Sequence, residues 1–359
     1  MQRPFRKLLG LATGAYATRR SLAGGPGHRG PPSDHFDGAV FRNENRQATA
    51  GRTFGDFLRW QRTSRAAVWP RWVEQNMAPS LPPTLQAGEC AVTFINHITF
   101  LLQFRGLNVL TDPVYAERAS PVQFAGPRRV HAPGIAFDAL PHIDLVLVSH
   151  NHYDHLDLDT LERLERVHRP LFLTGLGNAA FLQQHGLTRV REFDWWQAHQ
   201  DHGYRCTYVP AQHWSGRALR GRNRTLWGGF MLEADDCAVY FAGDTGYWTH
   251  FATIRERLGA PDVALLPIGA YEPRWFMRDQ HMNPADAVQA HLDLQARRSV
   301  ATHFGCFQLT DEAIDAPMLA LVEAREHAGI AEQEFRALRP GETWRIIAAA
   351  AATRASASA

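Results

Sequence analysis

Leu145-Val146-Leu147-Val148-Ser149-His150-Asn151-His152-Tyr153-Asp154-His155-Leu156-Asp157 joins an apolar run to a cluster of possible metal ligands. The apolar run predicts a buried strand, and a helical pattern of leucines follows it. Side chains two residues apart in an extended chain share a face, so His150 and His152 can point to one position. Asp154 and His155 lie where the chain turns and can point to a second position. Imidazoles and a carboxylate at this spacing suit Zn²⁺ and predict a metal site at the end of a strand.

Three later segments follow the same pattern, in which an apolar strand leads to one potential ligand. Residues 208–212 lead to His213, residues 239–243 lead to Asp244, and residues 300–302 lead to His303. Open α/β sheets form their sites beyond the carboxyl ends of their strands. We therefore expect these side chains to join the first cluster.

The combined set is too large for one tetrahedral metal site and fits two metal ions about 4 Å apart. Its members are His150, His152, Asp154, His155, His213, Asp244 and His303. We expect His150, His152 and His213 on the first ion, Asp154, His155 and His303 on the second, and Asp244 between them. The ligand types favour two Zn²⁺, with Fe or Mn as alternatives. Because such ions lower the pKa of bound water from about 15.7 towards 7, the pattern indicates a hydrolase.

Composition places the chain among ordinary globular proteins. Its 359 residues are 45% hydrophobic and 21% charged, which excludes fibrous and wholly disordered chains. The 38 basic and 36 acidic residues leave a net charge of +2, which argues against a nucleic-acid partner. Short apolar strands alternate with helical segments, as in an α/β protein. A helix predicted over residues 285–294 has a start signal in Asn283, Pro284 and Asp286.

We expect three parts along the chain. Residues 1–50 form a flexible basic arm, of which 21–50 is rich in Gly and Pro and could be a linker or a wrapping segment. Residues 51–347 form the hydrolase domain, and residues 348–359 form a disordered tail.

The location of the protein is weakly indicated by its cysteines and its N-terminus. The four cysteines are widely separated and form no C-x-x-C pair, which favours a reducing, cytoplasmic compartment over a disulfide scaffold. Arg3, Arg6 and Lys7 precede the apolar residues 8–11, so a weak secretory signal, a membrane-surface arm and plain disorder remain alternatives for this end. No apolar run approaches the roughly 20 residues that span a bilayer.

The ligand set resembles that of the metallo-β-lactamase fold superfamily, and other segments narrow the likeness. Those segments are Asn96–Thr99, Thr111–Pro113, Gln212–Trp214, Gly243–Gly246, Ile268–Met277 and Gln280–Pro284. Together they are similar to the N-acylphosphatidylethanolamine-hydrolysing phospholipase D group over residues 65–345, with 268–284 the most specific part. The resemblance implies a four-layer αββα sandwich with a binuclear site at one edge of the sheets.

The resemblance also implies a reaction and residue roles. A metal-bridging hydroxide would attack phosphorus and cleave N-acylphosphatidylethanolamine to phosphatidic acid and N-acylethanolamine. Asp154, Asp244 and His281 would be catalytic, with His281 orienting the phosphate or assisting the leaving oxygen. Asp112 and His97 would fix the orientation of ligands, although Asp112 could be a turn residue and His97 a core residue.

A phospholipid substrate requires an apolar surface near the site. Trp275 and Phe276, between two arginines, are the best candidates for contact with a membrane or micelle, although such aromatics are often core residues. No obligatory protein partner is evident, and a homodimer is compatible with the sequence. The protein would then be peripheral to the membrane.

Other functions remain open at this point. A metal-dependent hydrolase of a soluble phosphoester or a lactone would use the same centre. A di-iron oxidoreductase would need a flavin domain, and no dinucleotide fingerprint is present. A non-catalytic metal-binding module would usually have lost a ligand, and a nuclease would need a basic surface.

Overall fold

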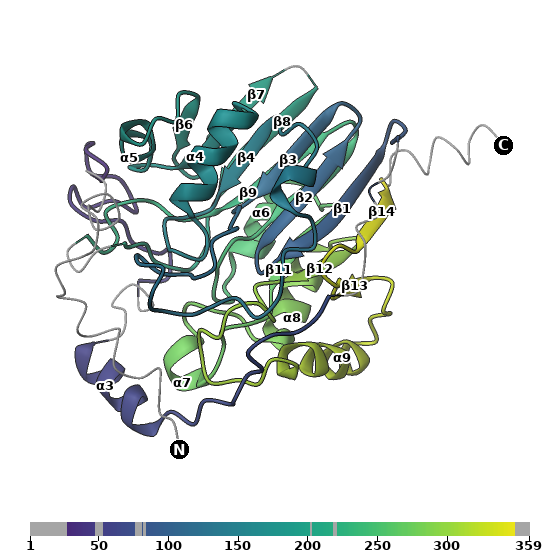
Figure 1. Cartoon of the computed structure of the whole chain (residues 1–359). Helices are drawn as coiled ribbons and strands as arrows, with labels where there is room; N and C mark the ends of the chain where they lie inside the picture. The colour runs from purple at the N-terminus through teal and green to yellow at the C-terminus, as the bar shows by residue number, and fades with distance from the viewer. Residues whose placement is uncertain are drawn as a thin grey trace.

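The computed structural model describes residues 27–46, 53–75, 81, 84–201, 203–217 and 221–348. Within these residues the chain forms two seven-stranded sheets that face each other (Figure 1). The first sheet has the order β14-β1-β2-β3-β4-β5-β6, and the second has the order β13-β12-β11-β10-β9-β8-β7. In each sheet, antiparallel pairs lead to parallel strands, namely β3 to β6 in the first and β10 to β13 in the second.

The strands are mostly short and buried. The first sheet contains β1 (Glu89–Asn96), β2 (Thr99–Phe104), β3 (Leu107–Thr111), β4 (Leu145–Val148), β5 (Leu171–Gly175), β6 (Val190–Phe193) and β14 (Thr343–Ile347). The second contains β7 (Ala198–Asp201), β8 (Tyr204–Val209), β9 (Gly229–Ala234), β10 (Cys237–Phe241), β11 (Val263–Pro267), β12 (Ser299–Thr302) and β13 (Phe335–Arg336).

Helices cover the outer faces of both sheets (Figure 1). The helices are α3 (Phe54–Thr63), α4 (Leu158–Val167), α5 (Ala179–Gln184), α6 (His250–Leu258), α7 (Arg274–Met277), α8 (Pro284–Leu294) and α9 (Ala316–Ala328), with a 3₁₀ turn η1 (Phe137–Ala139). Helices α4 and α5 pack on the first sheet, α8 packs on β11 of the second, and α6 and α9 contact α8. Asn283 caps α8 by accepting a hydrogen bond from the Asp286 amide, as the sequence predicts.

Strand β4 contributes to two hydrophobic cores, one between the sheets and one between the first sheet and its helices. Leu145 and Leu147 point into the core between the sheets, whereas Val146 and Val148 pack with α4 on the outer face. A strand that is apolar on both faces needs cover on both sides. The predicted α/β class and four-layer αββα sandwich are therefore confirmed.

The described part of the predicted flexible arm, for which a linker and a wrapping segment were both open, packs on the domain. Phe36 and Phe41 are buried in the core cluster between the sheets, and His35 contacts Asp194 at 2.7 Å between Nε2 and Oδ1. Residues 27–46 therefore wrap against the domain and are not a free linker, because two phenyl rings leave water when they pack. The predicted signal or membrane arm, and most of the predicted tail, lie outside the described residues.

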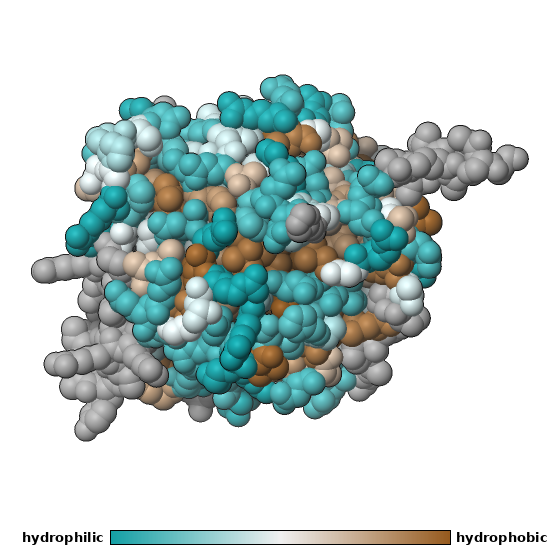
Figure 2. Space-filling model, turned by 90° about the horizontal axis from the view of Figure 1, so that it is seen from above, coloured by the Kyte–Doolittle hydropathy of each residue, from teal (hydrophilic) through white to brown (hydrophobic). Residues whose placement is uncertain are grey.

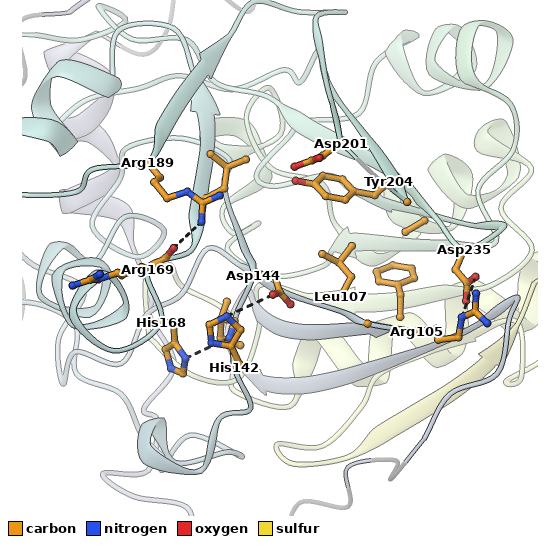
Figure 3. Close-up of a pocket in the computed structure, with 16 residues that line it drawn as sticks. Arg105, Leu107, His142, Asp144, His168, Arg169, Arg189, Asp201, Tyr204 and Asp235 are labelled. Carbon is orange, nitrogen blue, oxygen red and sulfur yellow. Dashed lines mark hydrogen bonds and ion pairs between the residues drawn. The ribbon is translucent and has the colours of Figure 1, made fainter.

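A cavity of about 440 Å³ opens at the end of the sandwich where the parallel strands β4, β5 and β6 begin. Turns and hairpins line it with guanidinium, imidazole and carboxylate groups, including Arg105, Arg189, His168, Asp144 and Asp235 (Figure 3). The predicted metal ligands follow the opposite ends of their strands, so this cavity is separate from them.

The surface carries both hydrophobic and hydrophilic residues. The face seen from above in Figure 2 has hydrophobic residues near its middle, surrounded by hydrophilic ones. Among the described residues, no helix combines the length and apolar character that crossing a bilayer requires.

Candidate metal centre

The structure brings all seven predicted ligands together at one edge of the two sheets. The cluster that includes His150 and His155 follows β4 of the first sheet, whereas His213, Asp244 and His303 follow β8, β10 and β12 of the second. These segments lie far apart in the sequence, and they meet because the carboxyl ends of these strands face the same edge.

The first group consists of His150, His152, His213 and Asp244, whose ligand atoms all lie within 4.8 Å of one another. Nδ1 of His152 is 2.7 Å from Nε2 of His150 and 3.2 Å from Nε2 of His213. Oδ2 of Asp244 is 3.6 Å from Nε2 of His213 and 4.0 Å from Nε2 of His150. Three nitrogens and one oxygen thus surround one point, which is the number of ligands in a tetrahedral zinc site.

The second group consists of Asp154, His155, His303 and His97, also within 4.8 Å. Oδ2 of Asp154 is 3.5 Å from Nε2 of His155 and 3.4 Å from Nε2 of His303. His97, expected to act only through a ligand, places Nε2 3.4 Å from the same oxygen. The second group therefore holds one more imidazole than the sequence led us to assign to it.

Asp244 lies between the two groups. Its Oδ2 is 3.1 Å from Nε2 of His155, and its Oδ1 is 3.1 Å from Nε2 of His303. The same carboxylate belongs to the first group, so it is placed to bridge two ions.

Hydrogen bonds to Nδ1, on the side of the rings opposite Nε2, fix the orientation of three imidazoles. Asp112 is fully buried and accepts from Nδ1 of His155 at 2.7 Å and from the Ser149 hydroxyl at 2.5 Å. The Ser149 oxygen in turn accepts from Nδ1 of His150, and the Gln280 carbonyl accepts from Nδ1 of His213. A ring that donates from Nδ1 leaves Nε2 free as a metal ligand.

Buried atoms without partners indicate that the centre fits metal ions. Nε2 of His155 and of His303 and Oδ1 of Asp244 are buried and lack a hydrogen-bond partner within the described residues. Such atoms are costly in a folded protein unless another group satisfies them. An ion at each group would satisfy the atoms that face it.

The charges at the centre also favour the binding of metal ions. Burial lowers the pKa of His152 and of His213 to about 3, which keeps both rings neutral and able to bind metal. Burial acts to raise the pKa of Asp244, but the imidazoles of His155 and His303 outweigh it and hold that pKa well below its usual value. The carboxylates raise the pKa of His303 to about 9 against the effect of burial, so the pocket attracts positive charge.

Tight turns place these side chains at the strand ends. Gly243, just before Asp244, has φ +61°, and a Cβ atom there would lie 2.6 Å from the Cβ of Ser149. His97 and His303 have φ of 45° and 63°, which is uncommon for residues other than glycine. Backbone conformations of this kind concentrate at functional sites.

His281 lies beside the centre, as the resemblance implies. Its Nδ1 is 3.9 Å from Oδ2 of Asp244, is buried and has no hydrogen-bond partner within the described chain. Arg274 holds the turn in place, because its guanidinium donates to the His281 carbonyl at 2.9 Å and to Asp286 at 2.6 Å.

Trp275 and Phe276 form part of α7 and are half-buried. Trp60 of α3 stacks on Phe276 with ring centroids 5.0 Å apart, and Arg59 lies over Trp275 at 4.6 Å. The two aromatics are therefore neither core residues nor fully exposed, and α3 covers part of their surface.

Sequence reasoning missed Asn43. Its side chain donates to the His213 carbonyl at 2.9 Å and accepts from the His213 amide at 3.0 Å. It also accepts from the Trp227 indole at 2.9 Å. A single asparagine in a Gly- and Pro-rich segment gives no signal of this role.

Known proteins with similar sequences support the interpretation of this site as a metal centre. Residues 107–304 match the family model described as the beta-lactamase superfamily domain. An uncharacterized protein of Mycobacterium tuberculosis is 42% identical over 256 residues, which cover 69% of this chain and 68% of that protein. The N-acyl-phosphatidylethanolamine-hydrolyzing phospholipase D 1 of Caenorhabditis elegans is 36% identical over 267 residues, which cover 70% of this chain and 74% of that protein.

Solved structures agree on the fold. Igni18, a metallo hydrolase from the archaeon Ignicoccus hospitalis, superposes with a TM-score of 0.56 and 23% identity over 72% of this chain and 98% of that chain. The fold family implies divalent metal ions, and the two groups of His and Asp side chains fit them. The chain belongs to the metallo-β-lactamase superfamily of metal-dependent hydrolases and, within it, to the family of the N-acylphosphatidylethanolamine-hydrolysing phospholipases D.

Proposed function

We propose that this enzyme is a phospholipase D that cleaves N-acylphosphatidylethanolamine to phosphatidic acid and N-acylethanolamine. The observation that carries the proposal is the pairing of a two-group centre with 36% identity to a relative that bears this name. Water adds to phosphorus, and the bond from phosphorus to the ethanolamine oxygen breaks. That oxygen leaves with a proton as the alcohol.

In this proposal, the seven clustered side chains hold two ions, which we propose are Zn²⁺, with Fe or Mn as alternatives. Bound ions would lower the pKa of water and neutralise charge on the phosphate oxygens. Asp244 and Asp154 keep the ions in place as ionised carboxylates.

His281 is the proposed group for the phosphate and the leaving oxygen. Burial lowers its pKa to about 3, so the ring is neutral and can donate one hydrogen bond. Its Nδ1 faces Asp244 from the side of α8, where a phosphate oxygen bound at the centre would come within its reach. The hydrogen bond from Arg274 to the His281 carbonyl fixes the position of the turn.

Product analysis by mass spectrometry tests the proposed reaction. Parent enzyme and an Asp244→Asn variant would be incubated with detergent-dispersed N-acylphosphatidylethanolamine. We expect phosphatidic acid and N-acylethanolamine from the parent alone. If the parent binds two equivalents of metal but forms neither product, the lipid substrate is wrong and a soluble phosphoester or lactone takes its place.

Trp275 and Phe276 are the proposed contact with a membrane or micelle surface, because both are half-exposed beside the turn that carries His281. Replacing both with Ser should raise KM for micellar lipid about 10-fold and leave turnover of a water-soluble phosphodiester unchanged. Phe124→Ser, at a ring that is 74% exposed and lies outside α7, is the matched control. An equal loss on both substrates would show that the pair supports the site and does not contact lipid.

A further inference from the structure

Two buried cysteines meet across the core between the sheets. Cys90 lies in β1 of the first sheet, and Cys237 begins β10 of the second. Their side chains are 0% and 1% exposed, and their sulfur atoms are 3.0 Å apart. All four cysteines of the chain are free thiols, and this contact joins residues 147 positions apart.

The pair requires little movement to form a bond. A disulfide has its sulfur atoms about 2.05 Å apart, so they need to approach by about 1 Å. Both cysteines belong to the hydrophobic core cluster between the sheets. A cross-link at this position would therefore leave the sheets and the metal centre in place.

The thiols lie beside the turn that joins β9 to β10. Cys237 pairs with Ala234 across the β9–β10 turn, and Asp235 in that turn accepts from the Gly88 amide at 3.1 Å. Asp235 also lines the 440 Å³ cavity, where Arg105 approaches it to 3.9 Å (Figure 3). Strand pairing and backbone hydrogen bonds hold this end of β1 and β10, so an oxidant reaches the thiols only when this end opens transiently or when the chain refolds.

We propose that Cys90 and Cys237 form an inter-sheet disulfide when the protein meets a low-molecular-weight disulfide. One thiolate attacks the oxidant and releases one thiol, which leaves a mixed disulfide. The second thiolate then attacks the protein sulfur of the mixed disulfide. The bond between Cys90 and Cys237 forms, and the remaining half of the oxidant leaves as a second small thiol. In sum, two protein thiols and one small disulfide give one protein disulfide and two small thiols.

The rate of this exchange depends on opening of the core. Contact with Cys90 and burial raise the pKa of the Cys237 thiol, so little thiolate forms while the core is closed. The bond forms slowly in the folded protein and readily during refolding. In a reducing compartment the pair remains as thiols, so the cross-link reports the redox state to which the chain has been exposed.

Thiol counting on the full-length protein tests the inference without reference to its activity. Reduced protein would be incubated with oxidised glutathione, and a second sample would be refolded in the same buffer. Both would be denatured, alkylated and weighed by mass spectrometry. We expect four alkylated cysteines before oxidation and two after it, with one linked peptide pair containing Cys90 and Cys237. The oxidised form should melt about 3–6 °C higher, because the bond closes a long loop in the unfolded chain.

Matched variants separate this pair from the other buried thiols. Cys206→Ala, also 1% exposed in the same core, should go from three alkylated cysteines to one. Cys237→Ala and Cys90→Ala should each stay at three, and neither should gain thermal stability on oxidation. Four free thiols in both oxidised parent samples would overturn the proposal. A linkage to Cys206 or Cys306, or a lasting glutathione adduct, would also overturn it.

Discussion

At the scale of single residues, His97 connects two of the proposed ligands of the second ion. Its ring nitrogen is 3.4 Å from Oδ2 of Asp154, and its carbonyl accepts from the His303 amide at 2.7 Å. Asp154 follows the first sheet and His303 the second, so His97 joins both halves of the second group. The first group has no comparable contact with His97 within the described residues. His97 is therefore a positioning residue for one of the two ions.

Replacing His97 with Ala should remove the second ion and leave the first. We expect metal analysis after gel filtration to give about two equivalents for the parent and one for the variant, with activity lower by about 10–100-fold. His97→Gln, which can still donate to Asp154, should recover part of the second equivalent. His199→Ala, at a buried histidine on β7, is the control and should bind two. A His97→Ala protein that keeps both ions would contradict this role.

The clustering of some of these residues could be predicted from sequence, and that of others could not. His150 and Asp154 belong to one short motif after one strand, so local spacing was enough to group them. His213 and His303 needed the added rule that strand ends converge, and the structure places both there. The position of His97 against Asp154 depends on a left-handed turn between β1 and β2, which residue types alone do not reveal.

At the scale of elements, the sequence left segment 27–46 open between a linker and a wrapping segment. Its low apolar content and its three glycines are typical of a linker, yet Phe36 and Phe41 reach the core between the sheets. Asn43 contacts His213, 170 residues away, so no local pattern contains the information. The strands and α8 were easier to predict, because apolar runs and a capping sequence are local signals.

Asn43→Ala should weaken both the fold and the first ion site. Three hydrogen bonds at a buried side chain are lost, and the His213 backbone is left without partners for its amide and carbonyl. We expect the free energy of unfolding to fall by about 2–3 kcal/mol, measured by urea titration of the metal-bound protein. The affinity for the first ion should fall as well, measured by competition with a chelator.

Arg42→Ala is the matched control within the same segment, because the Arg42 side chain is exposed and its ion pair with Asp37 lies at the surface. It should change the stability and the metal affinity little. If Asn43→Ala behaved like Arg42→Ala, the segment 27–46 would cover the domain without supporting the centre.

At the scale of the whole molecule, buried neutral histidines make the fold sensitive to acid. Burial lowers the pKa of His131 and of His291, and it lowers that of His250 to about 3. In the unfolded chain these rings titrate near 6.5. Below that value the unfolded state binds protons that the folded state does not, so stability falls as the pH decreases from 6.5 towards the folded pKa. His35 acts in the opposite direction, because Asp194 and Asp34 raise its pKa against the effect of burial.

His250 provides the clearest test, since it is 1% exposed, its ring packs on Phe251 at 4.0 Å, and it is not one of the clustered ligands. Its contribution is fully present above pH 6.5, and at pH 5 it should have lost about 2 kcal/mol of the free energy of unfolding. His250→Gln carries no titrating group, so its stability should fall less between pH 7.5 and pH 5. Urea titrations of parent and variant at both pH values measure the difference, and ions lost from the centre in acid affect both proteins alike. Parallel pH profiles for the two proteins would mean that His250 takes up its proton inside the fold, and that the acid sensitivity arises elsewhere.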